Sequence, residues 1–289
     1  MSSRSDPARV TPELLRSWGL PAPGESKNAR GRAFVVGGSA VSAGAVTLAG
    51  ESALRVGAGK VGVAVDADIA DVVRVAFPEA GVYVLPGSGD GADAAWHAEL
   101  DAADVVLVGP GFDSPGVTHA RLAEIVAHEP SCLVVDAFAV GVLDRVDRAQ
   151  LPASLIVNAN LDEAEILLGR PVGDPLRDVP EIARELGAVV HCYSAVAAPT
   201  GEAWDIGAGG PGLGTAGSGD VLAGAITGFA ARGLDPVRAA VWGAWCHAQA
   251  GDRLTARHGL GFLARELPPE VAAVLHDFDA PPRPTLTGR

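Results

Sequence analysis

Short apolar runs alternate with helix-length segments along most of the chain. The first such unit has an apolar run at residues 32–36, a helical pattern at residues 43–57 and a second apolar run at residues 61–65. This order predicts a strand, a helix and a second strand parallel to the first. Further strands are predicted from the apolar runs at residues 82–85, 105–108, 132–135 and 155–157.

These predicted strands are continuously apolar rather than alternating. Continuous runs indicate a sheet covered on both faces, hence a three-layer α/β fold with a mostly parallel central sheet. The last third of the chain is predicted to be helical at residues 221–232, 236–253 and 266–275. Residues 196–206 are typical of a hairpin that turns at Thr200 and Gly201.

The chain is predicted to form one domain behind a short tail. Residues 1–26 contain Pro21, Pro23 and Gly24, which interrupt every periodic pattern, and they lack the basic start and apolar run of a signal peptide. Residues 27–289 contain no Pro-, Ser- or Gly-rich linker and no charge block in their middle. We therefore expect a tail over residues 1–26 and a single domain over residues 27–289.

Composition excludes several classes of function. With 289 residues, 48% of them hydrophobic, the chain can bury a large core, yet no segment approaches eighteen consecutive apolar residues, so no membrane span is expected. A net charge of −13 opposes binding to nucleic acid. Cys132, Cys192 and Cys246 are isolated and odd in number, which favours a reducing cytoplasm over a disulfide framework. The seven histidines form no zinc motif and are mostly expected at the surface.

Most predicted strands end in small or polar residues. In an open α/β sheet, ligands bind outside the carboxyl ends of the strands, so these turns should face a common site. The turns are Gly37-Gly38-Ser39, Gly109-Pro110-Gly111, Asp136-Ala137 and Asn158-Ala159-Asn160.

The sharpest local signal is a glycine-rich turn, Gly217-Ser218-Gly219-Asp220, at the start of an apolar helix. Glycines let the backbone approach a ligand, and the free N–H groups of a first helical turn form an anion site. We predict that Gly217, Ser218 and Gly219 bind a nucleotide phosphate and that Asp220 acts as a general base. Alternatively, Ser218 is an N-cap and Asp220 only complements the helix dipole, worth about 0.3 to 1 kcal/mol.

Asn160 and Glu163 lie three positions apart at another predicted helix start. They could face one side, where Glu163 would hold a water of a phosphate-bound Mg²⁺. The alternative is a capping arrangement of Asn160 with Glu163 at the third helical position. Taken alone, the pair fits the second interpretation better.

Five stretches, at residues 31–39, 53–59, 108–111, 134–137 and 211–224, carry a family resemblance in their order along the chain. Together they resemble the ADP-dependent NAD(P)H-hydrate dehydratases of the ribokinase-like superfamily, over roughly residues 27–275. The resemblance implies repair of the hydrated nicotinamide ring of NADH and NADPH, with ADP or ATP and Mg²⁺ activating the ring hydroxyl. Phosphate is a good leaving group, so its elimination would regenerate the dinucleotide.

The same resemblance implies roles for individual residues. Ala45, Gly111 and Asp220 would contact the hydrate, with Asn160 facing it in place of the family's usual His. Gly219 would contact the adenine nucleotide, together with Val190, His191, Cys192, Tyr193 and Ser194. It also implies a cytoplasmic homo-oligomer.

The family's usual basic-Gly pair is Val190-His191 in this chain, and Gly210 replaces an Asn. If Val190 marks a lost cation, Val190→Arg should tighten ADP binding. Two other interpretations remain open. Asn160 and Glu163 favour a kinase of the same fold that acts on a small alcohol. The missing cation favours a non-catalytic nucleotide-binding protein.

Overall fold

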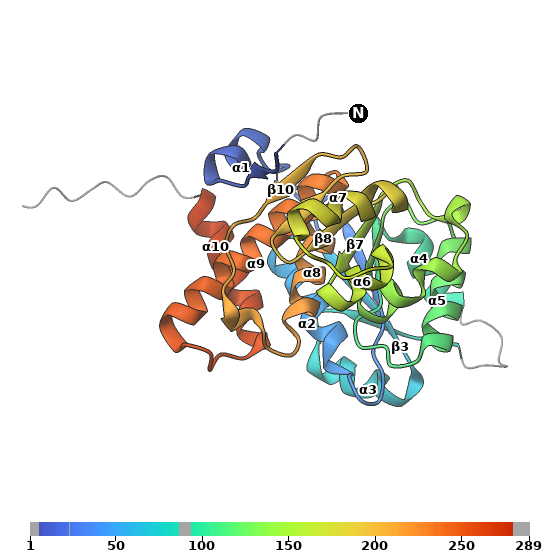
Figure 1. Cartoon of the computed structure of the whole chain (residues 1–289). Coiled ribbons are helices and arrows are strands. Elements are labelled where there is room, and N and C mark those ends of the chain that lie inside the picture. Colours follow the sequence, from blue (N-terminus) through green and yellow to red (C-terminus); the bar gives the residue numbers. More distant parts are fainter. Residues whose placement is uncertain (1–5, 23, 87–93, 280–289) are drawn as a thin grey trace, which may run out of the picture.

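A single ten-stranded sheet organises the described part of the chain (Figure 1). The computed structural model describes residues 6–22, 24–86 and 94–279. The strand order across the sheet is β1-β10-β9-β8-β7-β6-β5-β2-β3-β4. The strands are β1 (Ala8–Arg9), β2 (Arg32–Val36), β3 (Lys60–Val65), β4 (Gly81–Val84), β5 (Val105–Val108), β6 (Leu133–Asp136), β7 (Leu155–Ala159), β8 (Val189–Cys192), β9 (Ala195–Ala197) and β10 (Ala203–Asp205).

The seven strands from β8 to β4 in this order run parallel, whereas β9 and β10 add an antiparallel hairpin. All strands predicted from the apolar runs are present, within one or two residues of the expected bounds. The hairpin turns where Thr200 and Gly201 were expected. The predicted three-layer architecture with a mostly parallel sheet is therefore confirmed.

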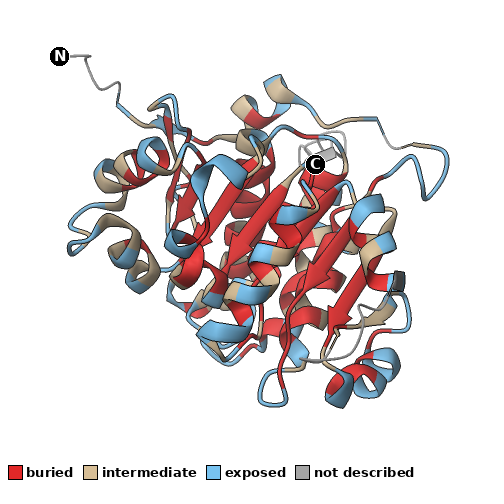
Figure 2. Cartoon of the chain, turned by 90° about the vertical axis from the view of Figure 1, so that its right-hand side faces the viewer, coloured by how far each residue is buried: buried red, intermediate tan, exposed pale blue. Residues whose placement is uncertain are grey.

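Helices cover both faces of the sheet, and Figure 2 shows its strands almost wholly buried between them. Alternate residues of the strands from β2 to β10 belong to two separate apolar clusters, one for each face. The helices are α2 (Gly44–Arg55), α3 (Ala67–Ala76), α8 (Ser218–Ala231), α9 (Pro236–His258) and α10 (Leu267–Asp279) on one face, and α4 (Ala94–Ala102), α5 (Pro115–Ala127), α6 (Leu161–Leu168) and α7 (Pro175–Leu186) on the other. Short 3₁₀ segments lie at Ala137–Arg145, Arg148–Gln150, Pro211–Leu213 and Ala264–Glu266.

The prediction of an irregular N-terminal tail is wrong for residues 8–18. Strand β1 pairs with β10, and helix α1 (Pro12–Trp18) buries Leu15 completely in the core. The Thr11 hydroxyl accepts a hydrogen bond from the Leu14 N–H and caps α1, and Pro12 is its first residue. Both elements are too short to show a hydrophobic period, so only the capping signals of α1 could have revealed that helix.

Membrane insertion finds no support in the helices. Within the described ranges, no helix is both long and apolar enough to cross a bilayer.

Candidate active site

A cavity of about 710 Å³ opens at the carboxyl ends of β6, β7 and β8, beside the first turns of α6 and α8. Its volume falls within the usual range for small-molecule and cofactor sites. Two of the four predicted strand-end turns line it, at Asp136-Ala137 and at residues 158–160, and so does the glycine-rich turn at residues 217–220. Segments separated by about eighty residues in the sequence therefore meet at one site.

The first turn of α8 is the natural anion site of this cavity. The N-cap, Gly217, has φ +89°, which favours glycine, and a Cβ there would come within 2.7 Å of Leu48. The N–H groups of Gly219 and Asp220 find no acceptor within the described part of the chain, as expected for a first helical turn. A Cβ at Gly219 would meet nothing within 4 Å. The turn thus offers free donors and an open approach to an anionic ligand.

Among the described residues, three carboxylates line this cavity. Burial raises the pKa of Asp220 to about 6 and also raises that of Glu163. For Asp136, burial first and then the charges of Asp220 and Glu163 raise the pKa well above its usual range. No lysine or arginine is among the described residues that line the cavity. The site therefore needs an added cation before it can hold a polyphosphate favourably.

A hydrogen-bonded row of side chains crosses three neighbouring strands at the floor of the cavity. Asp136, Asn158 and His191 are paired in register on β6, β7 and β8. The Asn158 amide donates to Asp136 Oδ1 at 2.8 Å, and its carbonyl oxygen lies 2.7 Å from His191 Nδ1. Each of the three is only 5% exposed. Burial lowers the pKa of His191 to about 4, so its ring is neutral at physiological pH.

A second buried pair joins α8 to α9. His247 Nε2 lies 3.0 Å from the Ser218 hydroxyl, and both side chains line the cavity. Burial, followed by the neighbouring His191 ring, lowers the pKa of His247 to about 4. The expectation of surface histidines is therefore wrong for His191 and His247. The position of His247 within the apolar pattern of α9, between Cys246 and Ala248, is the sequence signal for its burial.

Asn160 and Glu163 form a complete capping box at the start of α6. The Asn160 side chain accepts from the Glu163 N–H, and the Glu163 carboxylate accepts from the Asn160 N–H, both at 2.9 Å. The capping alternative is thus realised. Both residues also line the cavity, so a metal role for Glu163 stays a prediction.

The predicted nucleotide-binding residues of β8 divide between two faces of the sheet. His191, Tyr193 and Ser194 line the cavity, whereas Val190 and Cys192 are fully buried in the apolar cluster on the opposite face. Burial raises the pKa of the Cys192 thiol to about 12, which makes it unreactive. Side chains alternate along a strand, so an arginine at position 190 would enter the core rather than the cavity. The expected gain in ADP affinity from Val190→Arg therefore has no structural basis.

Ala45 and Gly111, expected to contact the hydrate, lie next to each other but do not line this cavity. A Cβ at Gly111 would approach Ala45 Cβ to 2.9 Å and the Ser42 carbonyl oxygen to 2.6 Å. The same Cβ would lie 3.1 Å from Gly38 Cα, so the two remaining strand-end turns meet here. In the same turn the Ser39 hydroxyl is buried without a hydrogen-bond partner in the described ranges. These residues form a second cluster, at the start of α2.

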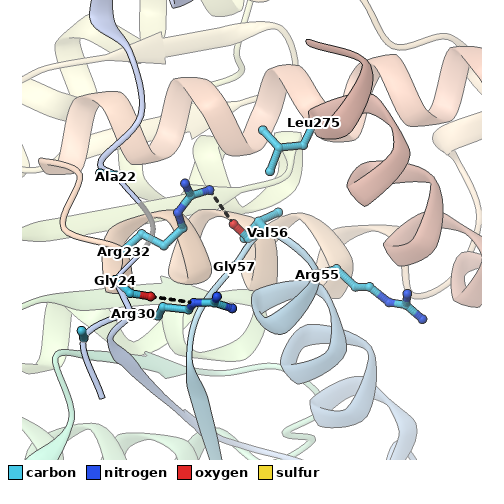
Figure 3. Close-up of a pocket in the computed structure, with 9 residues that line it drawn as sticks. Ala22, Gly24, Arg30, Arg55, Val56, Gly57, Arg232 and Leu275 are labelled. Carbon is cyan, nitrogen blue, oxygen red and sulfur yellow. Dashed lines mark hydrogen bonds between the residues drawn. The ribbon is translucent and has the colours of Figure 1, made fainter. Parts of the chain in front are cut away.

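Another cavity, of about 280 Å³, is lined by Arg30, Arg55 and Arg232 (Figure 3). Arg232 Nη1 donates to the Val56 carbonyl at 2.8 Å, Arg30 Nε donates to the Gly24 carbonyl at 3.2 Å, and Arg55 pairs with Glu51. Arg55 and Arg232 lie at the carboxyl ends of α2 and α8, where cations compensate the helix dipole. These arginines therefore serve the fold.

Comparison with known proteins agrees with the geometry. Residues 33–272 match the family described as NAD(P)H-hydrate dehydratase. An ADP-dependent (S)-NAD(P)H-hydrate dehydratase from Xanthomonas campestris pv. campestris is 43% identical, over 92% of this chain and 95% of that protein.

Solved structures share the fold. A ribokinase-like superfamily protein from Enterococcus faecalis superposes with a TM-score of 0.82 at 23% identity, covering 95% of this chain and 97% of that chain. An ADP/ATP-dependent NAD(P)H-hydrate dehydratase from Bacillus subtilis, co-crystallised with ATP and Mg²⁺, gives 0.78 at 23% identity over 95% and 99% of the two chains. The chain has a ribokinase-like fold and belongs to the NAD(P)H-hydrate dehydratase family.

Proposed function

We propose that this protein is an enzyme that dehydrates (S)-NADH hydrate and (S)-NADPH hydrate to the intact dinucleotides, at the expense of ADP or ATP. The observation that carries this proposal is the first turn of α8, where the N–H groups of Gly219 and Asp220 lie beside the half-buried Asp220 carboxylate. Family membership and the 43% identical dehydratase support the same substrate and co-substrate.

In this proposal the α8 turn binds the terminal phosphate of the nucleotide. The N–H groups of Gly219 and Asp220 hold the charge that develops during phosphoryl transfer. Asp220 accepts the proton of the ring hydroxyl as that hydroxyl attacks the phosphorus atom. Transfer leaves AMP from ADP, or ADP from ATP, and elimination of phosphate then restores the nicotinamide ring.

Mg²⁺ is proposed as the cation that the cavity lacks. Asp136 and Glu163 carry hard oxygen ligands of the kind that Mg²⁺ accepts. Across the described ranges, no three His, Cys, Asp or Glu side chains are placed to hold a metal ion by themselves. Mg²⁺ commonly binds through one or two carboxylates plus substrate phosphates, so the nucleotide would complete its coordination. When bound, the metal would neutralise phosphate charge.

The hydrate is proposed to bind at the cluster formed by Ala45, Gly111 and the Ser39 turn. Gly111 has φ +75° and packs directly on Ala45 in the first turn of α2. A buried hydroxyl without a partner is destabilising, so Ser39 would gain a hydrogen bond when the dinucleotide binds. Asn160, the N-cap of α6, would also face the hydrate.

A cytoplasmic location and a homo-oligomeric state are also proposed. The three cysteines are free thiols in the structure, as suits a reducing compartment. Sedimentation of the purified protein would test its assembly.

The decisive experiment incubates the protein with NADH hydrate, Mg²⁺ and either ADP or ATP, and follows the absorbance of NADH. Restored absorbance together with released phosphate is the expected result. A stable phosphorylated product would instead indicate a small-alcohol kinase, and binding without turnover would indicate a nucleotide-binding protein. Either outcome would overturn the proposal.

A further inference from the structure

Tyr193 is an exposed aromatic residue in an unusual backbone conformation at the cavity. It has φ +54°, in the left-handed region, and 64% of the residue is accessible to solvent. It forms a two-residue turn with Ser194 between the antiparallel strands β8 and β9. Tyr193 lines the cavity.

This conformation is unfavourable for tyrosine. Two-residue hairpin turns with positive φ favour Asn, Asp or Gly, and a bulky residue there is strained. The Tyr193 ring and hydroxyl make no hydrogen bond or ring contact with the rest of the described chain. The fold therefore gains nothing visible from an aromatic ring at this turn, and strained residues of this kind cluster at functional sites.

An apolar side chain, Ile206, lies beside the turn that carries Tyr193. Ile206 is held next to the turn because its N–H donates to the Ser194 carbonyl at 2.8 Å. Ile206, Ala208 and Pro175 line the same cavity. This lining contrasts with the phosphate-binding turn of α8, which carries the free N–H groups. The cavity thus has a polar turn for an anion and, among its lining residues, apolar side chains and an exposed aromatic ring.

We infer that Tyr193 is the stacking platform for the adenine ring of the nucleotide. The inference rests on the proposed function, which supplies the adenine nucleotide. Stacking gains importance here because the described residues that line the cavity include no lysine or arginine to hold the phosphates. Binding must then draw on the base as well as on the metal and the backbone donors. Stacking of a base on an aromatic side chain adds binding free energy and needs no charged group.

The experiment compares wild type with Tyr193→Asn and Tyr193→Phe by calorimetric titration with Mg²⁺-ADP and with Mg²⁺-pyrophosphate, which has no base. Asn tolerates the left-handed conformation, so Tyr193→Asn should fold and melt at or above the wild-type temperature. Its dissociation constant for Mg²⁺-ADP should rise about 5- to 150-fold, as loss of one stack predicts. Binding of Mg²⁺-pyrophosphate should not change, and Tyr193→Phe should stay within about threefold of wild type for both ligands.

Equal ADP affinity in wild type and Tyr193→Asn would overturn the inference and leave the proposed function intact. Parallel weakening of ADP and pyrophosphate would also overturn it, because the ring would then act on the whole site rather than on the base. Conversely, Tyr193→Asn could lose affinity for Mg²⁺-ADP alone while the wild-type protein fails to restore NADH. That result would support stacking and refute the proposed dehydratase activity.

Discussion

Replacing Asp220 by Asn is the sharpest test of the catalytic assignment. The substitution keeps the size of the side chain and the first turn of α8 but removes the ability to accept a proton. Positioned general bases contribute roughly 10² to 10⁴-fold, or about 3 to 5 kcal/mol of barrier. Turnover should therefore fall by that factor, while binding of Mg²⁺-ADP changes little.

The pKa of Asp220 gives this prediction a pH signature. Burial raises it to about 6. The base form is populated above that value, so wild-type turnover should fall as pH drops through about 6, and the residual rate of Asp220→Asn should lose this step. Because the folded-state pKa lies above the unfolded one, the folded state binds the proton more tightly. Asp220 therefore costs stability above about pH 6, and the cost disappears as pH falls toward 4.

The size of that cost follows from the shift itself. A pKa of about 6 against the usual 3.8 corresponds to about 2 to 3 kcal/mol at neutral pH. Asp220→Asn should therefore unfold at higher urea concentration than wild type at pH 7.5, with the difference shrinking at pH 4.5. NADH absorbance gives the rate and urea titration the stability. A variant that keeps most of its turnover, or one less stable at pH 7.5, would refute the assignment of Asp220 as a general base with a raised pKa.

Four further substitutions test the remaining assignments. Glu163→Gln should weaken the Mg²⁺ dependence of turnover if the carboxylate binds the metal. An unchanged Mg²⁺ titration, with stability lower by about 1 kcal/mol, would show that Glu163 acts only in the capping box. Gly219→Val should fold normally, because its Cβ meets open space, yet it should lose Mg²⁺-ADP binding in calorimetry. Normal binding would refute the assignment of the phosphate site to the first turn of α8. Val190→Arg should lower the urea midpoint strongly without tightening ADP binding, because it buries a charge in the core; a gain in affinity would contradict the observed strand register. Asn158→Leu should cost at least about 2 kcal/mol in urea unfolding, since it leaves Asp136 and His191 buried without their partner; unchanged stability would show that the row is dispensable.

The sequence predicted the parts of the fold that depend on long, simple patterns. Apolar runs such as residues 105–108 mark a strand buried on both faces, and the glycine-rich turn before Val221 marks the start of α8. The two-residue strand β1 and the seven-residue helix α1 went unpredicted because so few residues cannot establish a period. Their stability comes from contacts with β10 and the core, which are distant in sequence.

The candidate site was predictable by location but not by side-chain direction. Strand-end turns correctly placed Asp136 and Asn158 at the cavity. Which residues of β8 face it depends on a register of one residue, because a shift by one exchanges the two faces of a strand. Residues 190–194 alone do not fix that register. The polar partners on neighbouring strands do, since Asn158 lies opposite His191 rather than Val190.

That register also accounts for the chemistry of the site. An apolar Val190 packs the far face of the sheet, while the neutral His191 closes a hydrogen-bonded row on the near face. The cavity then presents carboxylates, amides and neutral imidazoles but no fixed cation among its described residues. Such a site repels free polyphosphate and accepts it only when a metal or backbone donors neutralise the charge. The Asp220 base benefits from the same arrangement, because without a nearby lysine or arginine its pKa stays raised to about 6, close to the pH at which a general base works best.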